Sequence, residues 1–174
     1  MPEKINIELK ARCVNISNVR NILISLNAFF KGEDHQTDTY FNIQNGRLKI
    51  REGTIENCLV YYERPNYLKP MKCCYDIIKF EPNDKTLESI KKILISSLGI
   101  KVIIEKKREI YFIGNVKFHL DSVNNLGNFL EIEAIGSEFD NEESLSGQCN
   151  EYILQLGIKE EDMIGLSYSD MFGK

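Results

Sequence analysis

The sequence lacks the motifs of a cysteine-based metal site and of a disulfide scaffold. Its five cysteines are odd in number, and none of them shows CxxC or Cys/His spacing. The sequence also lacks an apolar run approaching about 18 residues and an apolar segment near its N-terminus. We therefore expect a protein of the reducing cytoplasm, with no zinc site, no signal peptide and no membrane-spanning helix.

An excess of positive charge is lacking as well. The 22 Lys and Arg are outnumbered by 26 Asp and Glu, which gives a net charge of −4. A general affinity for nucleic acid or for an anionic membrane is therefore not expected, and cations that bind phosphate must be concentrated locally. The 174 residues, 43% of them hydrophobic, can bury a core. With no repeat and no long polar linker, they predict one domain over residues 1–174.

Most of the chain alternates between apolar and polar residues, which is typical of strands. About eight such segments occur, over residues 5–12, 36–43, 46–53, 58–65, 73–80, 101–114, 115–123 and 128–136. Asn45-Gly46 and Gly114-Asn115 predict two tight hairpins. The helical spacing of apolar residues predicts amphipathic helices over residues 17–30, 83–99 and 141–157, with a short helical turn over 167–172.

Basic residues gather on the polar faces of two predicted strands. Arg47, Lys49 and Arg51 alternate along one strand and share a face. Lys106 and Arg108 share a face on another. Like charges at this spacing repel one another unless an anion is present.

Acidic residues gather on the polar faces of other strands, at Glu8, Asp121, Glu131 and Glu133. Glu131 and Glu133 share one face and repel each other unless a cation is present. A polyanion that carries a divalent metal would relieve the repulsion among the basic residues and among the acidic ones together.

The amphipathic helices need an apolar surface to cover, and the apolar faces of the strands provide one. We therefore expect an α+β fold in which an eight-stranded antiparallel β-barrel closes around charged side chains, with the helices packed outside. Eight strands suffice to close a barrel around one small ligand. The alternative is an ordinary antiparallel sheet whose polar faces lie in water.

Several short motifs resemble those of the CYTH domain, also called the triphosphate tunnel metalloenzyme fold. The family hallmark is Glu-x-Glu-x-Lys on the first strand, and residues 6–10 read NIELK, so that Glu8 and Lys10 match whereas Asn6 does not. The order of further motifs resembles the class IV adenylate cyclase branch: QTDTYF, GRLKIRE, YYERP, IEKKREIYFIG, KFHLDSV, LGNFLEIE and SYSDMF. The resemblance extends over nearly the whole chain.

The resemblance implies roles for the charged residues of the strands. Divalent metal, Mg²⁺ or Mn²⁺, would be held by the carboxylates of Glu8, Glu131 and Glu133. The triphosphate oxygens would be bound by Arg47, Lys49, Arg51, Lys106 and Arg108. Arg64 would replace a lysine that the family usually has on the fourth strand. The catalytic residues would be Lys10 and Asp121.

The resemblance leaves three functions open for a small-molecule triphosphate ligand. In a class IV adenylate cyclase, the ribose 3′ hydroxyl of ATP attacks the α-phosphate, and cyclic AMP and pyrophosphate form. In a triphosphatase, water attacks a terminal phosphate of an inorganic or organic triphosphate. In a binding module, catalysis is weakened because Asn6 lacks the charge of a glutamate. Related cyclases also suggest a homodimer.

One predicted strand brings an imidazole next to an acid. His119 shares a face with Lys117 and Asp121. It is a candidate general base, and the simpler interpretation is a structural imidazole that is hydrogen-bonded in the interior.

Overall fold

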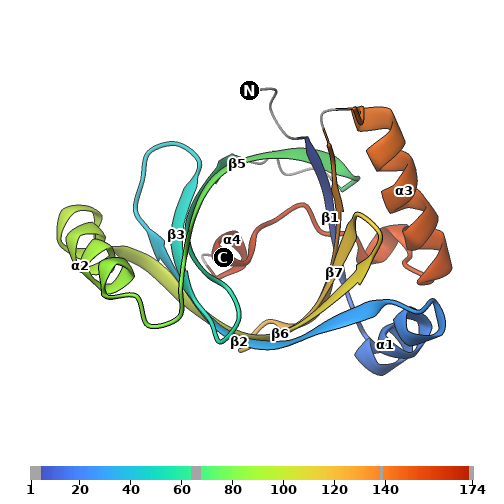
Figure 1. The fold of residues 1–174 in the computed structure, drawn as a ribbon, viewed down its shortest axis with the longest axis horizontal. Helices are drawn as coiled ribbons and strands as arrows, with labels where there is room; N and C mark the ends of the chain where they lie inside the picture. Colours follow the sequence, from blue (N-terminus) through green and yellow to red (C-terminus); the bar gives the residue numbers. More distant parts are fainter. Residues whose placement is uncertain (1–4, 64–67, 138, 173–174) are drawn as a thin grey trace.

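The computed structural model describes residues 5–63, 68–137 and 139–172, and in this part of the chain eight strands form one antiparallel sheet (Figure 1). The strands are β1 (Asn6–Arg12), β2 (Phe29–Phe41), β3 (Arg47–Glu52), β4 (Asn57–Glu63), β5 (Met71–Phe80), β6 (Ile100–Ile113), β7 (Val116–Val123) and β8 (Gly127–Ile135). Their order in the sheet is β1-β5-β4-β3-β2-β6-β7-β8. The sheet curls around a central cavity.

The longer helices lie on the outer side of this curled sheet (Figure 1). The helical elements are α1 (Ile16–Ser25), α2 (Lys85–Leu98), α3 (Glu142–Gln155), the 3₁₀ helix η1 (Glu160–Asp162) and α4 (Tyr168–Met171). The hydrophobic core fills the space between the helices and the sheet. Leu145 of α3 is fully buried against β1 and β8, and Leu87 of α2 packs with Ile50 of β3. Where the helices cover the sheet, the apolar faces of the strands therefore point outwards, and charged side chains of β1, β3, β6 and β8 point inwards.

Strand β1 joins the two ends of the curled sheet. It pairs with β8 along its whole length, Asn6–Arg12 against Phe129–Ile135. It also pairs with β5, through Asn6, Ile7 and Glu8. The predicted α+β class with eight antiparallel strands is thus confirmed. Full closure of the sheet into a tunnel depends on the short pairing of these three residues of β1 with β5.

The two hairpin predictions have different outcomes. Gly114 and Asn115 alone join β6 to β7, as predicted, and Gly114 takes a φ of 55°, which glycine adopts without steric cost. The connection between β2 and β3 contains Asn45 and Gly46 but extends over residues 42–46. The prediction of a two-residue turn there is therefore wrong in length.

The first predicted helix is wrong at its C-terminal end. Helix α1 stops at Ser25, and Phe29 and Phe30 begin β2. Asn27 takes a φ of 57°, which breaks the helical path, and the two phenylalanines then pair with the end of β6. Strand pairing therefore overrides the helical spacing of these apolar residues.

The chain after α3 crosses the curled sheet from β1 towards β3. The backbone amide of Ile164 donates to the carbonyl of Lys10 in β1, at 2.9 Å. Further along, Asp170 of α4 pairs with Arg47 of β3. Because β1 and β3 are separated by two other strands in the sheet, this segment spans one side of the central cavity.

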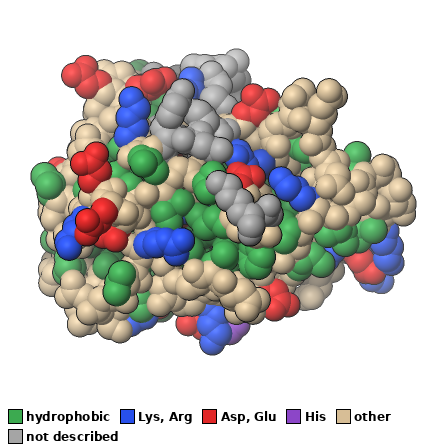
Figure 2. Space-filling view, turned by 180° about the vertical axis from the view of Figure 1, so that it is seen from behind, with side chains coloured by type: hydrophobic (Ala, Val, Ile, Leu, Met, Phe, Trp, Pro, Cys, Tyr) green, Lys and Arg blue, Asp and Glu red, His purple; other side chains and the backbone are tan. Residues whose placement is uncertain are grey.

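Charged residues of both signs are scattered over the face of the molecule seen in Figure 2. On the face seen in Figure 2, hydrophobic side chains gather near the middle, and Lys, Arg, Asp and Glu side chains lie around them. The local concentration of cations that the sequence predicts lies inside the sheet, where Lys49, Arg51, Lys106 and Arg108 line the cavity.

Candidate active site

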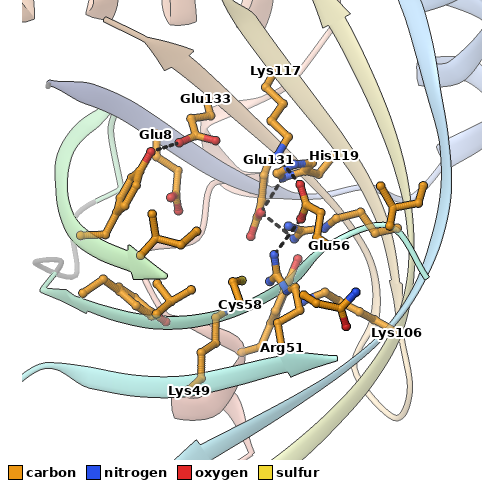
Figure 3. Close-up of a pocket in the computed structure, with 18 of the residues that line it drawn as sticks. Glu8, Lys49, Arg51, Glu56, Cys58, Lys106, Lys117, His119, Glu131 and Glu133 are labelled. Atoms are coloured by element: carbon orange, nitrogen blue, oxygen red, sulfur yellow. Dashed lines mark hydrogen bonds and ion pairs between the residues drawn. The ribbon is translucent and has the colours of Figure 1, made fainter. Parts of the chain in front are cut away.

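A cavity of about 380 Å³ lies inside the curled sheet. The predicted site residues that line it are Glu8, Lys10, Lys49, Arg51, Lys106, Arg108, Glu131 and Glu133. They come from β1, β3, β6 and β8, and those labelled in Figure 3 point into one common space. The structure thus brings these side chains together, whereas their individual roles stay predictions.

The other predicted site residues have different positions. Arg47 belongs to a smaller pocket beside α4, where its Nη2 lies 2.6 Å from Asp170 Oδ2. Asp121 is fully buried and does not line the larger cavity. Neither Arg47 nor Asp121 therefore lines the larger cavity, and their roles stay predictions. Arg64 lies outside the described residues.

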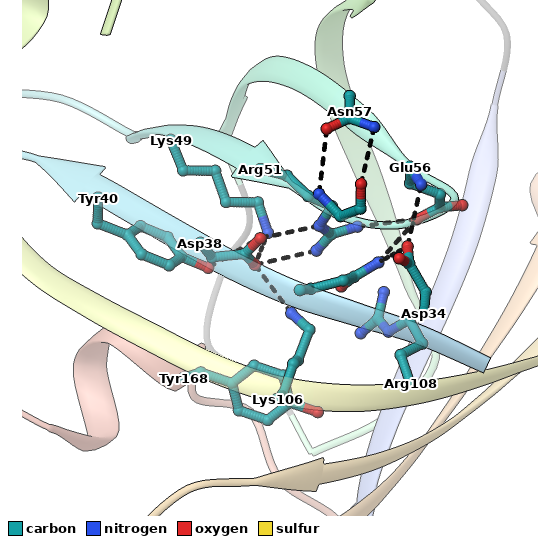
Figure 4. A network of polar contacts seen from close by, with 12 residues as sticks. Asp34, Asp38, Tyr40, Lys49, Arg51, Glu56, Asn57, Lys106, Arg108 and Tyr168 are labelled. Carbon is teal, nitrogen blue, oxygen red and sulfur yellow. Dashed lines mark hydrogen bonds and ion pairs between the residues drawn. The ribbon is translucent and has the colours of Figure 1, made fainter. Parts of the chain in front are cut away.

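Three basic residues of the cavity surround a carboxylate that was not among the predicted site residues (Figure 4). Asp38 of β2 accepts hydrogen bonds from Lys49 Nζ at 2.9 Å, from Arg51 Nε at 2.8 Å and from Lys106 Nζ at 2.8 Å. We call these four residues the Asp38 cluster. Burial opposes the negative charge of Asp38, but the three cations hold its pKa well below the ordinary value. The cluster is therefore an ionised group that carries more positive than negative charge.

Lys106 is the most enclosed cation of the Asp38 cluster. Its side chain is fully buried. Burial lowers the pKa of Lys106 to about 7, although the charge of Asp38 acts in the opposite direction. The charges of Arg51 and Arg108 lower it further. Near neutral pH, the protonation of Lys106 therefore depends on what else occupies the cavity.

Asp121 orients Arg108 from below the cavity surface. Arg108 Nε donates to Asp121 Oδ1 at 2.6 Å, and its Nη2 donates to Glu131 Oε2 at 2.8 Å. The Tyr168 hydroxyl of α4 donates to Asp121 Oδ2 at 2.7 Å. The Tyr168 ring also lies 3.7 Å from Lys10 Nζ, measured to the ring centroid. The C-terminal segment thus holds two cations of the cavity in place.

Glu56 and Lys117 form a second pair in the cavity, and neither is among the predicted site residues. Lys117 Nζ lies 2.8 Å from Glu56 Oε1, and Arg51 Nη1 lies 3.1 Å from Glu56 Oε2. The buried Asp34 fixes the loop that carries Glu56, because it accepts from the backbone amides of Ile55 and Glu56 at 2.8 and 3.0 Å. Lys117 shares a strand face with His119, so its position could be foreseen, whereas Glu56 lies in a loop without periodicity.

Two carboxylates face each other on the opposite side of the cavity. Glu8 of β1 and Glu133 of β8 are direct partners in the strand register, and we call them the acid pair. Burial, and then the charge of Glu8, raises the pKa of Glu133. Asn6 lies beside them, and its Nδ2 donates to Glu133 Oε1 at 2.8 Å and to the Tyr75 hydroxyl. The family position that usually carries glutamate is therefore filled here by a hydrogen-bond donor to the acid pair.

The acid pair fits a hard divalent cation, since two adjacent carboxylates offer oxygen ligands and lose their mutual repulsion when a cation binds. Glu131, the third predicted ligand, is already paired with Lys10 Nζ at 3.1 Å and with Arg108. Among the described residues, no group of three or more His, Cys, Asp or Glu is arranged to hold a metal ion. A metal site of all three glutamates would therefore require Glu131 to exchange its cation partners.

His119 lies deep in the cavity wall beside Glu131. Its Nδ1 is 3.1 Å from Glu131 Oε2, and in the described part of the chain its Nε2 has no hydrogen-bond partner. Burial, followed by the charges of Arg108 and Lys117, lowers the pKa of His119 to about 3. The imidazole is therefore neutral near pH 7, as expected for a buried histidine that is hydrogen-bonded in the interior.

The fold and the cavity define an α+β protein whose curled antiparallel sheet holds basic and acidic clusters on its inner face. Residues 4–168 match the CYTH domain, and the chain therefore belongs to the CYTH domain family. This family is metal-dependent and includes enzymes that act on triphosphates. Over the described residues, no helix is long and apolar enough to cross a membrane.

Individual relatives resemble the chain over almost its whole length. A Methanocaldococcus jannaschii protein provisionally named an adenylate cyclase is 29% identical over 97% of this chain and 99% of its own. The structure of a Pyrococcus horikoshii protein matches with a TM-score of 0.80 and 27% identity, over 95% of this chain and 98% of that one. A Hippeastrum protein, described as an adenylyl cyclase candidate with a dominant triphosphatase activity, shares the fold with a TM-score of 0.64 and 16% identity, over 98% and 95% of the two chains. These comparisons support an enzyme and leave its reaction open.

Proposed function

We propose that this protein is a metal-dependent enzyme that acts on the triphosphate group of a small-molecule substrate. The observation that carries the proposal is the Asp38 cluster, which holds Lys49, Arg51 and Lys106 around one carboxylate inside a cavity. Arg108 lines the same cavity. A triphosphate carries several negative charges in a row, and these four cations can bind successive phosphate oxygens.

The acid pair would hold the metal, Mg²⁺ or Mn²⁺, together with Glu131. When bound, such an ion neutralises charge on phosphate oxygens and activates the nucleophile. Lys10 also lines the cavity, where it pairs with Glu131. We propose that Lys10 contacts the phosphates and that Asp121 acts as a positioning residue, because it holds the guanidinium of Arg108 without lining the cavity.

The reaction we favour is that of a class IV adenylate cyclase, which forms cyclic AMP and pyrophosphate from ATP. The name of the M. jannaschii relative supports it. The alternative is hydrolysis of an inorganic or organic triphosphate, which the activity described for the Hippeastrum protein supports. Both reactions need the same positioning and charge neutralisation around the phosphates.

Incubation with ATP and either Mg²⁺ or Mn²⁺, followed by separation of the products, distinguishes the two reactions. Cyclic AMP with pyrophosphate identifies the cyclase, and ADP or free phosphate identifies the triphosphatase. If ATP and inorganic triphosphate both stay intact, the proposal of an enzyme is contradicted.

A binding module with weakened catalysis is the third candidate, and Asn6 is the observation that favours it. The amide of Asn6 donates to Glu133 where a glutamate would add a metal ligand. If this substitution limits the enzyme, Asn6→Glu will raise the metal-dependent rate and the affinity for Mn²⁺. An unchanged rate in a folded Asn6→Glu protein would mean that Asn6 does not weaken catalysis.

Further expectations accompany this function. We propose that the sheet closes fully into a tunnel, that residues 1–174 form a single CYTH domain in the cytoplasm, and that the protein forms a homodimer. Light scattering coupled to size-exclusion chromatography tests the dimer, because it measures the mass in solution directly.

A further inference from the structure

The cavity has two unlike walls. Most of the charged side chains come from β1, β2, β3, β6, β7 and β8, whereas β4 and β5 contribute mainly apolar and aromatic side chains, with Lys79 of β5 as a charged exception. Val60 and Ile77 are direct partners across these two strands, as are Tyr62 and Tyr75, and all four line the cavity. We call these four residues the apolar wall.

Two residues of the apolar wall are more exposed than cations that line the same cavity. Ile77 is 42% exposed and Tyr75 is 41% exposed, whereas Lys49 and Arg51 are 9% and 8% exposed. The usual preference is the reverse, because apolar side chains gain free energy when they leave water. An exposed apolar surface with polar groups at its edge is typical of a ligand-binding site.

The apolar wall adjoins the two charged regions of the cavity. Val60 is the direct register partner of Lys49, and Lys49 Nζ lies 5.8 Å from the centroid of the Tyr62 ring. At the other end, the Tyr75 hydroxyl lies 3.4 Å from Glu133 Oε1. A ligand whose phosphates contact Lys49 and the other cations therefore has apolar surface within reach of its remaining part.

We infer that the apolar wall binds the aromatic ring and linker of an organic triphosphate, and that the substrate is a nucleoside triphosphate in preference to inorganic triphosphate. This inference rests on the proposed function, because the phosphate-binding cations fix where the organic part lies. Inorganic triphosphate would leave Ile77 and Tyr75 in contact with water. A base or sugar packed on them removes that apolar surface from water and gains affinity that the phosphates alone cannot supply.

Calorimetric titration with EDTA present compares the ligands without turnover, since the proposed reaction requires metal. The probes are ATP, CTP and inorganic triphosphate. The test variant is Ile77→Ser, and the matched control is Ile78→Ser, because Ile78 is the neighbouring exposed isoleucine of β5 and does not line the cavity. Val60→Thr serves as a second, nearly isosteric variant of the apolar wall, and circular dichroism verifies that each variant is folded.

The expected result has two parts. At least one nucleoside triphosphate binds the unmodified protein more tightly than inorganic triphosphate does. Ile77→Ser then weakens that binding roughly tenfold and changes inorganic triphosphate by less than about twofold, while Ile78→Ser leaves both unchanged.

Two other results are informative in different ways. The inference is overturned, and the proposed function is left intact, if inorganic triphosphate binds as tightly as both nucleotides. The same holds if Ile77→Ser and Val60→Thr weaken the binding of all three ligands equally. Failure of all three ligands to bind the unmodified protein, with EDTA or with Mg²⁺, overturns the proposed function itself.

Discussion

The Asp38 cluster and the acid pair are opposite solutions to the problem of placing charge inside a protein. In the cluster, three cations from two strands converge on one carboxylate, so the chain supplies its own counterion. In the acid pair, Glu8 and Glu133 stand opposite each other in the register, and the charge of Glu8 raises the pKa of Glu133. The difference indicates that the first region is assembled by folding alone, whereas the second gains stability when a cation binds.

The largest effect is expected when the cluster loses its carboxylate. Asp38→Ala leaves three buried cations close together, and we expect a loss of about 3–5 kcal/mol in the free energy of unfolding. Urea denaturation measures it. Asp76→Ala, which removes an exposed carboxylate from β5, is the control and should change stability by less than about 0.5 kcal/mol. Equal stability of the two variants would show that the cations of the cluster do not need Asp38.

Removal of one cation from the cluster should affect binding more than stability. Arg51→Ala leaves Asp38 paired with Lys49 and Lys106, so the protein should fold. We expect triphosphate binding to weaken roughly 100-fold, because a charged donor to phosphate is lost from a buried site. Titration calorimetry measures the affinity. Arg20→Ala, which breaks an ion pair with Glu109 on the outer side, should bind as the unmodified protein does, and a similar affinity for Arg51→Ala would contradict the proposed phosphate site.

Removal of one charge from the acid pair should change stability less than the loss of Asp38 does, and should increase it. A carboxyl group whose folded pKa is raised binds more protons folded than unfolded, so stability falls as pH rises from the unfolded pKa through the folded one. Glu8→Gln removes a main cause of the raised pKa of Glu133, and we expect a gain of about 1 kcal/mol near pH 7 in EDTA. Thermal unfolding from pH 4 to 8 measures this gain.

The same variant should respond less to metal. Mn²⁺ stabilises the unmodified protein in proportion to its affinity for the folded state, and Glu8→Gln removes one ligand. Glu81→Gln, which changes an exposed glutamate, should keep the full stabilisation. If Glu8→Gln and the unmodified protein gain equally from Mn²⁺, the acid pair does not bind the metal.

The smallest effect concerns the proton on Lys106. Because burial lowers its pKa to about 7, part of the Lys106 population is neutral at pH 8, and a bound polyanion favours the charged form. Triphosphate binding at pH 8 should therefore take up a fraction of a proton, and the affinity should fall as pH rises above 7. Calorimetry in buffers of different ionisation enthalpy measures the uptake. Lys106→Arg should abolish the contribution of this residue, and an identical uptake in that variant would assign the proton to another group.

Period-two spacing was sufficient to place residues of β1, β3, β6 and β8 in one cavity, because alternation fixes which face a side chain occupies. Asp38 could have been found in the same way, since Gln36, Asp38 and Tyr40 alternate within QTDTYF. Glu56 could not, because it is positioned by the buried Asp34 and by no periodic pattern. The positions of Asp121 and Arg47 could not be foreseen either, because their partners Tyr168 and Asp170 come from a segment distant in sequence.

The Tyr168–Asp121 hydrogen bond and the pairing of β1 with β8 join segments that are far apart in the sequence. Lys10 is synthesised well before its partners Glu131 and Tyr168, which follow more than a hundred residues later in the sequence. The binding cavity is therefore completed only after synthesis has passed Tyr168. Until then, the early strands lack partners for their apolar faces, and exposed surface of this kind favours aggregation of a nascent chain.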